Sequence, residues 1–177
     1  TEKKKYGTEY SVDSPAITGY TADKTIVSGT MPAEDLEVTV TYSILPYTLT
    51  VHYVYADGPM KGQAAFKDYT KKVDYGDEYR KQTTPIVGYT ADQLVVNGKM
   101  PAEDLEVTVS YSINSYYLTV YYVYANGNTA VATHKDTLDY GDSYSVPSPA
   151  VEGYTPDKTV VSGKMETEDV VVYVTYT

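Results

Sequence analysis

Residues 47–58, Tyr-Thr-Leu-Thr-Val-His-Tyr-Val-Tyr-Ala-Asp-Gly, carry the pattern on which the fold prediction depends. Leu49, Val51 and Tyr53 alternate with threonine and histidine, which is the two-residue period of a β-strand with one buried face. The Asp-Gly pair that follows suits a tight turn. Residues 116–127, Tyr-Tyr-Leu-Thr-Val-Tyr-Tyr-Val-Tyr-Ala-Asn-Gly, repeat this stretch. The chain is therefore predicted to contain two copies of one opening strand and its turn.

A longer unit follows this strand and recurs along the chain. A Tyr-Gly pair is followed at fixed offsets by Gly-Tyr-Thr, an Asp, a Gly, a Met and a final Tyr. The matched positions are Tyr6, Tyr75 and Tyr140; Gly19, Gly88 and Gly153; Asp23, Asp92 and Asp157; Gly29, Gly98 and Gly163; Met31, Met100 and Met165; Tyr42, Tyr111 and Tyr176. Such repetition indicates a tandem array. We predict a partial, N-terminally truncated module over 1–46 and full modules over 47–115 and 116–177; the alternative is a permuted folding unit that begins near Tyr-Gly.

Each module should end on a closing strand with the same alternation, at residues 36–42, 105–111 and 170–176. In the full modules the opening and closing strands should bury one cluster. Its predicted members are Leu49, Val51, Tyr53, Leu105, Val107, Val109 and Tyr111, and in the last module Leu118, Val120, Tyr122, Val170, Val172, Val174 and Tyr176. The partial module has no opening strand, so its open edge should be covered by the second module, by a swapped strand or by another copy.

The remaining segments predict short elements and stiff joints. Short strands, each stopped by a glycine, are expected at 25–27, 94–96 and 159–161. At least one of the repeated glycines should have a positive φ. Single helical turns with Pro at their start are expected at 32–36 and 101–105. The linkers 43–46 and 112–115 are short and lack Gly, so they should be stiff. The expected fold is mainly β with very little helix, as small tandem modules in an elongated rod.

The order of these motifs resembles the mucin-binding-protein (MucBP) repeats and the related B-type repeats of internalin-like surface proteins. The likeness rests on Val-x-Tyr-Val-Tyr-Ala-Asp/Asn-Gly, Tyr-Gly-Asp-x-Tyr, Gly-Tyr-Thr and a final Val-x-Val-x-Tyr strand, and it covers both full modules and most of the first. It implies β-grasp-like (ubiquitin-like) modules on the surface of a Gram-positive bacterium, in a cell-wall-attached protein. It also implies adhesion to mucin or other host glycoprotein glycans. Residues 45–49, Leu-Pro-Tyr-Thr-Leu, lack the final Gly of a wall-anchoring signal.

Composition excludes several classes of site. The 177 residues include 14 Lys and Arg against 24 Asp and Glu, for a net charge of −10, which disfavours binding to nucleic acid or anionic membrane. No run of apolar residues is long enough to insert into a membrane. There is no Cys, and the only histidines, His52 and His134, occupy different positions of the repeat. The acidic clusters at 34–37 and 103–106 lack a calcium-loop spacing and should be solvated turns. We therefore expect no catalytic residue, cofactor or metal.

Tyrosine is the unusual component, at 22 residues against one Phe and no Trp. On the outward side of the last module, Tyr117, Tyr121 and Val123 of the opening strand should meet Val171 and Tyr173 of the closing strand. Their surroundings are polar in the second module, where the equivalent side is formed by Thr48, His52, Val54, Glu106 and Thr108. Tyr117, Tyr121 and Tyr173 are the candidate ligand-binding residues, because phenol rings can stack on sugars and donate hydrogen bonds. The alternatives are a contact with a further domain or a dimer partner, and plain strand propensity.

Three function classes remain. The first is a non-enzymatic surface module that adheres to mucin-type glycoproteins or glycans. The second is a structural stalk, in which neighbouring repeats of the same chain support one another. The third is an accessory module of a secreted enzyme.

Overall fold

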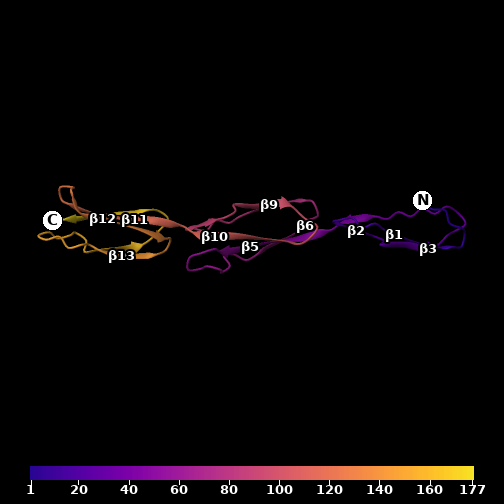
Figure 1. The fold of residues 1–177 in the computed structure, drawn as a ribbon, viewed down its shortest axis with the longest axis horizontal. Helices are drawn as coiled ribbons and strands as arrows, with labels where there is room; N and C mark the ends of the chain where they lie inside the picture. The colour runs from indigo at the N-terminus through magenta and orange to yellow at the C-terminus, as the bar shows by residue number, and fades with distance from the viewer. The chain divides into compact units, whose positions relative to one another are not determined.

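Every regular element of the protein is a β-strand (Figure 1). The computed structural model describes all residues from Thr1 to Thr177. The strands are β1 (Glu9–Asp13), β2 (Tyr20–Ala22), β3 (Ile26–Thr30), β4 (Tyr42–Ile44), β5 (Pro46–Tyr55), β6 (Tyr69–Asp74), β7 (Glu78–Gln82), β8 (Tyr89–Ala91), β9 (Val95–Lys99), β10 (Leu105–Ile113), β11 (Ser115–Tyr124), β12 (Thr129–Asp139), β13 (Ser143–Pro147), β14 (Val160–Lys164) and β15 (Val170–Tyr176). The expectation of a mainly β fold is confirmed. The helical turns expected at 32–36 and 101–105 are bends instead. No helix that could cross a membrane is present.

The chain forms two compact units, which we describe separately. The first comprises residues 1–52, 68–82 and 95–107, and the second comprises residues 53–67, 83–94 and 108–177. The division runs through the second repeat, so each unit contains one complete joint between consecutive repeats.

The last repeat, in the second unit, is built on a three-stranded sheet in which β11 lies between β12 and β15. β12 runs antiparallel to β11, whereas β15 pairs with β11 in parallel, from Leu118↔Val170 to Tyr124↔Tyr176. Because side chains alternate along a strand, one face of β11 carries only core residues. The buried cluster comprises Leu118, Val120, Tyr122, Val146, Val161, Met165, Val174 and Tyr176, with Val170 and Val172 packed at its margin. The core predicted for 116–177 is therefore confirmed.

The second repeat shows the predicted strand register. β5, β6, β8 and β10 belong to a four-stranded sheet in the order β6-β5-β10-β8. Along β10, Glu106 and Thr108 are exposed, whereas the alternate residues Leu105 and Val107 are half-buried. Of the seven residues predicted to form the core of this repeat, five are fully buried: Leu49, Val51, Tyr53, Val109 and Tyr111.

The first repeat departs from the prediction. The closing strand expected over 36–42 does not form, since residues 32–41 have no regular structure and only Tyr42–Ile44 is a strand. In the last repeat the equivalent strand, β15, pairs with β11, and residues 1–46 contain no such partner. The expected cover from the second module is absent too, because Leu36 and Val38 stay exposed. A strand sequence without a neighbouring strand has no ladder to join.

The repeated glycines are required for two different reasons, backbone conformation and space. Gly19, Gly88 and Gly153 have φ values of 77, 78 and 81°, so the expected left-handed conformation is confirmed. The second reason is space for a neighbouring side chain, and it applies to Gly29, Gly98 and Gly163. The expectation that these three glycines stop their strands is wrong.

The strands β3, β9 and β14 continue through these glycines, each of which stands opposite a tyrosine of the paired strand. A Cβ on Gly29, Gly98 or Gly163 would lie 2.8, 2.6 or 2.5 Å from that phenol oxygen. The glycine is therefore required for a ring to lie across the ladder rather than for a turn.

The joint between the first two repeats, inside the first unit, is closely packed. A Cβ on Gly19 would lie 2.0 Å from Cδ1 of Tyr75. The Leu45 N–H donates to the Gly19 carbonyl at 2.8 Å, and the Tyr75 N–H donates to the Leu45 carbonyl at 3.0 Å. The second unit repeats this joint with the equivalent residues Gly88, Asn114 and Tyr140. Each linker is therefore held by two backbone hydrogen bonds and one ring.

Candidate functional site

The candidate site lies on the outward face of the sheet in the last repeat. The alternation that buries Leu118 and Val120 places Tyr117 and Tyr121 on the opposite side of β11. The same alternation on β15 buries Val174 and turns Val171 and Tyr173 outward. The structure thus places all three predicted site residues on one face.

The parallel pairing of β11 and β15 brings the two central tyrosines together. Tyr121 stands opposite Tyr173, and Thr119 stands opposite Val171. The rings of Tyr121 and Tyr173 stack with centroids 5.1 Å apart and an interplanar angle of 21°. Tyr173, Val171 and Tyr117 are 57, 55 and 60% exposed. We call this set of Tyr117, Tyr121, Val171 and Tyr173 the aromatic face.

Polar groups border the aromatic face on the β12 side. Thr137 stands opposite Tyr117, and Lys135 stands opposite Thr119. Residues directly opposite in an antiparallel pair share a face of the sheet. A ligand on the aromatic face would therefore meet two stacked rings, a third ring, hydroxyl groups and one ammonium group.

This arrangement suits binding and not bond cleavage. Stacked phenol rings offer a flat apolar surface with hydrogen-bonding tips, which fits the C–H face and hydroxyl rim of a sugar. Neither an activated nucleophile nor an acid–base pair accompanies the rings. The second repeat has polar residues at the equivalent positions, so the aromatic face belongs to the last repeat.

The two histidines occupy unrelated settings. His52 Nδ1 lies 3.0 Å from Asp68 Oδ2, and His134 Nε2 lies 2.7 Å from Asp136 Oδ2. The second pair borders a cavity of about 410 Å³ next to Tyr122. No group of three or more possible metal-ligating side chains occurs in the chain.

The acidic turns have a role that the sequence analysis missed. The Thr48 N–H at the start of β5 donates to Asp104 Oδ1 at 2.6 Å, and the Tyr117 N–H of β11 donates to Asp169 Oδ1 at 2.8 Å. These carboxylates therefore fix the beginning of an opening strand. The sequence contains a signal for this role, because an Asp at 35, 104 and 169 immediately precedes each segment with the closing-strand pattern.

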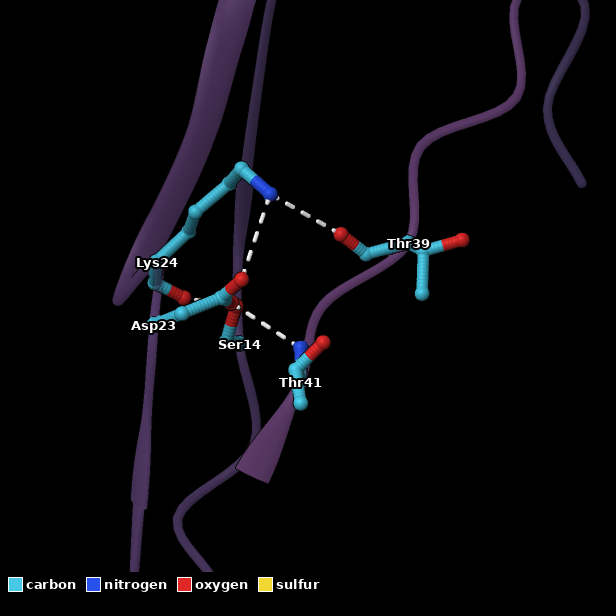
Figure 2. A network of polar contacts seen from close by, with 5 residues as sticks. All are labelled: Ser14, Asp23, Lys24, Thr39 and Thr41. Carbon is cyan, nitrogen blue, oxygen red and sulfur yellow. Dashed lines mark hydrogen bonds and ion pairs between the residues drawn. The ribbon is translucent and has the colours of Figure 1, made fainter. Parts of the chain in front are cut away.

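A second missed feature is an Asp-Lys clip that holds the closing segment of the first repeat (Figure 2). Asp23 Oδ1 accepts the Thr41 N–H at 2.9 Å, and Lys24 Nζ donates to the Thr39 carbonyl at 3.0 Å. The Ser14 hydroxyl donates to the Lys24 carbonyl at 2.6 Å. The backbone hydrogen bond from Thr41 is the main reason that the pKa of Asp23 is lowered.

The last repeat carries the same clip. Asp157 Oδ1 accepts the Thr175 N–H at 2.8 Å, and Lys158 Nζ donates to the Tyr173 carbonyl at 2.9 Å. The pKa of Asp157 is lowered, first by the backbone hydrogen bond from Thr175 and then by Lys158. The clip therefore orients the backbone beneath one ring of the aromatic face.

Comparison with known proteins assigns these repeats to a family. Residues 48–112 and 117–177 each match the MucBP domain, and residues 3–46 match the Muc B2-like domain. Internalin I of Listeria monocytogenes serotype 4b (strain F2365) is 32% identical over 152 residues, which cover 82% of this chain and 8% of that protein. The chain thus spans only a small part of this curated relative.

Two solved structures are similar to the chain. The Bacillus anthracis TIE protein is 16% identical with a TM-score of 0.58, over 96% of this chain and 41% of its own, and so shares the fold. The type 2 repeat of the mucus binding protein MUB from Lactobacillus reuteri is 18% identical with a TM-score of 0.34, over 74% of this chain and 98% of its own. Since the matched MucBP domains cover more than half of the residues, the chain belongs to the MucBP family, as a non-enzymatic repeat module of extracellular surface proteins.

Proposed function

We propose that the chain binds mucin-type glycoprotein glycans through the aromatic face of its last repeat. The observation that carries the proposal is the stacked pair of Tyr121 and Tyr173, flanked by the exposed ring of Tyr117. Exposed apolar side chains gathered on one face of a soluble protein usually mark a contact surface. The family to which the chain belongs supports a mucus-type partner.

The geometry favours a sugar over a peptide strand as the ligand. Tyr117 and Tyr121 lie on the middle strand of the sheet, where the backbone groups of β11 are already bonded to β12 and β15. Tyr173 lies on the edge strand β15, where the clip already holds the Tyr173 carbonyl and the Thr175 N–H. A peptide could therefore not extend the ladder there. A sugar needs only ring stacking and hydroxyl contacts, which the tyrosines, Thr137 and Lys135 can supply.

The test is mucin binding by the full chain and by the double variant Tyr121→Ala with Tyr173→Ala. We expect the affinity for purified mucin, measured by biolayer interferometry, to fall at least tenfold, or about 1.4 kcal/mol. The matched control is Tyr6→Ala, which removes another exposed tyrosine, 77% exposed, from the other compact unit.

Unchanged affinity in the double variant would remove the aromatic face as the ligand site. An equal loss in Tyr6→Ala would show that binding follows general tyrosine content. Far-ultraviolet circular dichroism should be the same for all three proteins, because the aromatic face contributes nothing to the buried cluster.

A structural stalk is a second function that a specific observation favours. Both linkers are held by paired backbone hydrogen bonds and a ring packed on glycine, which restricts bending at the joint. A stiff joint would present the last repeat at a fixed orientation to its neighbour. The two functions are compatible, since a spacer can also carry a binding face.

We also infer that each repeat is one β-grasp-like module, with boundaries after residues 46 and 115, in a protein attached to a Gram-positive cell wall. The parallel pairing of the first and last strands of residues 116–177 supports the module type. The likeness to Internalin I supports the location. Separate expression of residues 116–177, followed by an unfolding measurement, would test the boundary.

A further inference from the structure

A cavity opens at the border of the core in the last repeat. Its volume is about 410 Å³, and it is lined by Tyr122 and Val146, which belong to the buried cluster. His134 and Asp136 border it from β12, where each stands opposite a core residue of β11. Residues directly opposite in an antiparallel pair share a face of the sheet, so the cavity lies on the core side. It is therefore separate from the aromatic face.

The second repeat has a lysine side chain at the equivalent place. At the same offsets from the Tyr-Gly pair, His134 and Val146 correspond to Tyr69 and Lys81. The register of β6 on β5 matches that of β12 on β11 at this point. Lys81 Nζ lies 4.7 Å from the centroid of the Tyr69 ring, which is a cation–π contact. In the second repeat, an ammonium group thus occupies the position that borders the cavity in the last repeat.

The cavity is the space that this lysine would fill. Valine ends at its Cγ atoms, so the outer Cδ, Cε and Nζ atoms of Lys81 have no counterpart at Val146. The other buried members of the cluster have identical residues at their equivalents in the second repeat; Tyr122 and Met165, for example, correspond to Tyr53 and Met100. Val146 is the buried member that differs, so the cavity follows from a change at its border and not from a different core.

The charge at this border is reversed as well. Asp136 stands where the second repeat has Lys71. Asp136 Oδ2 lies 2.7 Å from His134 Nε2, whereas Asp136 Oδ1 accepts no hydrogen bond. Thr133 and Ser145 also line the cavity, and no lysine or arginine does. An ammonium group has three N–H donors, and the cavity offers it one carboxylate oxygen and two hydroxyl groups.

We propose that this cavity binds a primary alkylammonium group, carried by a lysine side chain of another polypeptide or by a free alkylamine. The alkyl chain lies against Val146 and Tyr122, where the second repeat holds its own lysine, and the ammonium group pairs with Asp136. The net charge of −10 attracts such a cation to the chain. The Asp136 side chain is 47% exposed, so the affinity should be modest, with a dissociation constant of about 1–10 mM.

The test is a titration of the isotope-labelled full chain with n-butylamine, followed by NMR. This ligand reproduces the lysine side chain from Cβ to Nζ and is still protonated at about pH 8. We expect saturable amide shifts at Thr133, His134, Asp136 and Ser145. Butan-1-ol has the same chain without the charge and should bind at least about fivefold more weakly. Equal binding of the two ligands would overturn the proposal.

Two variants locate the ammonium group. Asp136→Asn removes its counter-charge and should weaken binding at least about fivefold. The matched control is Glu152→Gln, which removes an exposed carboxylate of the same repeat outside the cavity and should leave the affinity unchanged. His134→Tyr with Val146→Lys rebuilds the pair of the second repeat within the same core, so this double variant should fold. It should show no saturable shifts, because its own lysine fills the cavity.

The capped tripeptide acetyl-Gly-Lys-Gly-amide distinguishes the two sources of the ammonium group. Saturable shifts with the tripeptide assign the cavity to a lysine side chain, whereas shifts with n-butylamine alone assign it to a free amine. No saturable shift with either ligand, or an unchanged affinity in Asp136→Asn, would overturn the proposal. Circular dichroism checks the fold of the double variant, and retained binding in its folded form would overturn the proposal as well.

Discussion

The joint between the second and third repeats predicts a large difference between two chemically identical substitutions, Gly88→Ala and Gly153→Ala. Both glycines have nearly the same left-handed φ, 78 and 81°. A Cβ on Gly88 would lie 2.1 Å from Cδ1 of Tyr140, whereas a Cβ on Gly153 would have no atom within 4 Å. The pair therefore separates the conformational cost from the cost of displacing the ring.

The two costs can be worked out separately. Alanine in the left-handed region costs about 1–2 kcal/mol, and both variants incur it. Removing a fully packed aromatic ring costs about 3–5 kcal/mol, and Tyr140 is half-buried, so its displacement should cost about 2 kcal/mol more in Gly88→Ala alone. The expected gap of about 2 kcal/mol is a roughly 30-fold difference in the unfolding equilibrium of the second unit, which contains both glycines.

Urea unfolding of the second unit is the appropriate assay, because that unit contains both glycines and its free energy of unfolding includes both costs. This free energy should be about 2 kcal/mol lower in Gly88→Ala than in Gly153→Ala. At the joint itself, the Asn114 N–H bonded to the Gly88 carbonyl at 2.9 Å and the Tyr140 N–H bonded to the Asn114 carbonyl at 2.8 Å should exchange faster in Gly88→Ala alone, because Gly153 lies outside the joint. In a Tyr140→Ala background the extra cost of Gly88→Ala should vanish, since the clash partner is gone.

The reasoning would be refuted if the two alanine variants lowered the free energy of unfolding of the second unit equally, within about 0.5 kcal/mol. It would also fail if the Tyr140→Ala background left the gap unchanged. Either result would mean that the left-handed backbone alone requires glycine at the joint.

Three further predictions concern single repeats. Lowering the pH should destabilise the last repeat through Asp157, whose pKa in the folded state lies below the ordinary value of 3.8. The stabilisation by the clip is therefore complete above pH 3.8 and is lost as the pH falls through the lowered pKa. Asp157→Asn should remove this part of an acid titration followed by circular dichroism. Tyr176→Phe should lower the free energy of unfolding in urea by about 1–2 kcal/mol, because the buried Tyr176 hydroxyl donates to the Pro149 carbonyl at 2.6 Å. No loss would mean that water replaces this hydrogen bond in the variant. Met165→Ala should lower the free energy of unfolding by about 2–3 kcal/mol and Met31→Ala by less than about 1 kcal/mol, because Met165 is fully buried in the core cluster and Met31 is half-buried. Equal losses in urea unfolding would show that Met31 is packed as tightly as Met165.

The sequence alone was sufficient for the repeat, the mainly β class and the face of each strand. These features are local: a two-residue period defines which side chains share a face, and matched offsets define the repeat. The two-residue period also places Tyr121 and Tyr173 on outward faces of their strands, whichever strands pair. Their stacking then required one tertiary fact, the parallel register of β11 and β15.

Strand pairing in the tertiary structure decides features that the two-residue period of the sequence does not determine. Residues 36–42 and 105–111 differ only at Thr41 and Ser110, yet the second segment is a strand and the first is irregular up to residue 41. Likewise, Gly19 and Gly88 have a positive φ at a joint, whereas Gly29, Gly98 and Gly163 lie inside paired strands. Only the tertiary structure shows which tyrosine ring packs on each of these glycines. The physical reason is that residues far away in the chain supply both the hydrogen-bonding partners of a strand and the ring that occupies the space beside a glycine. A nearly identical segment therefore folds differently when no partner strand lies beside it.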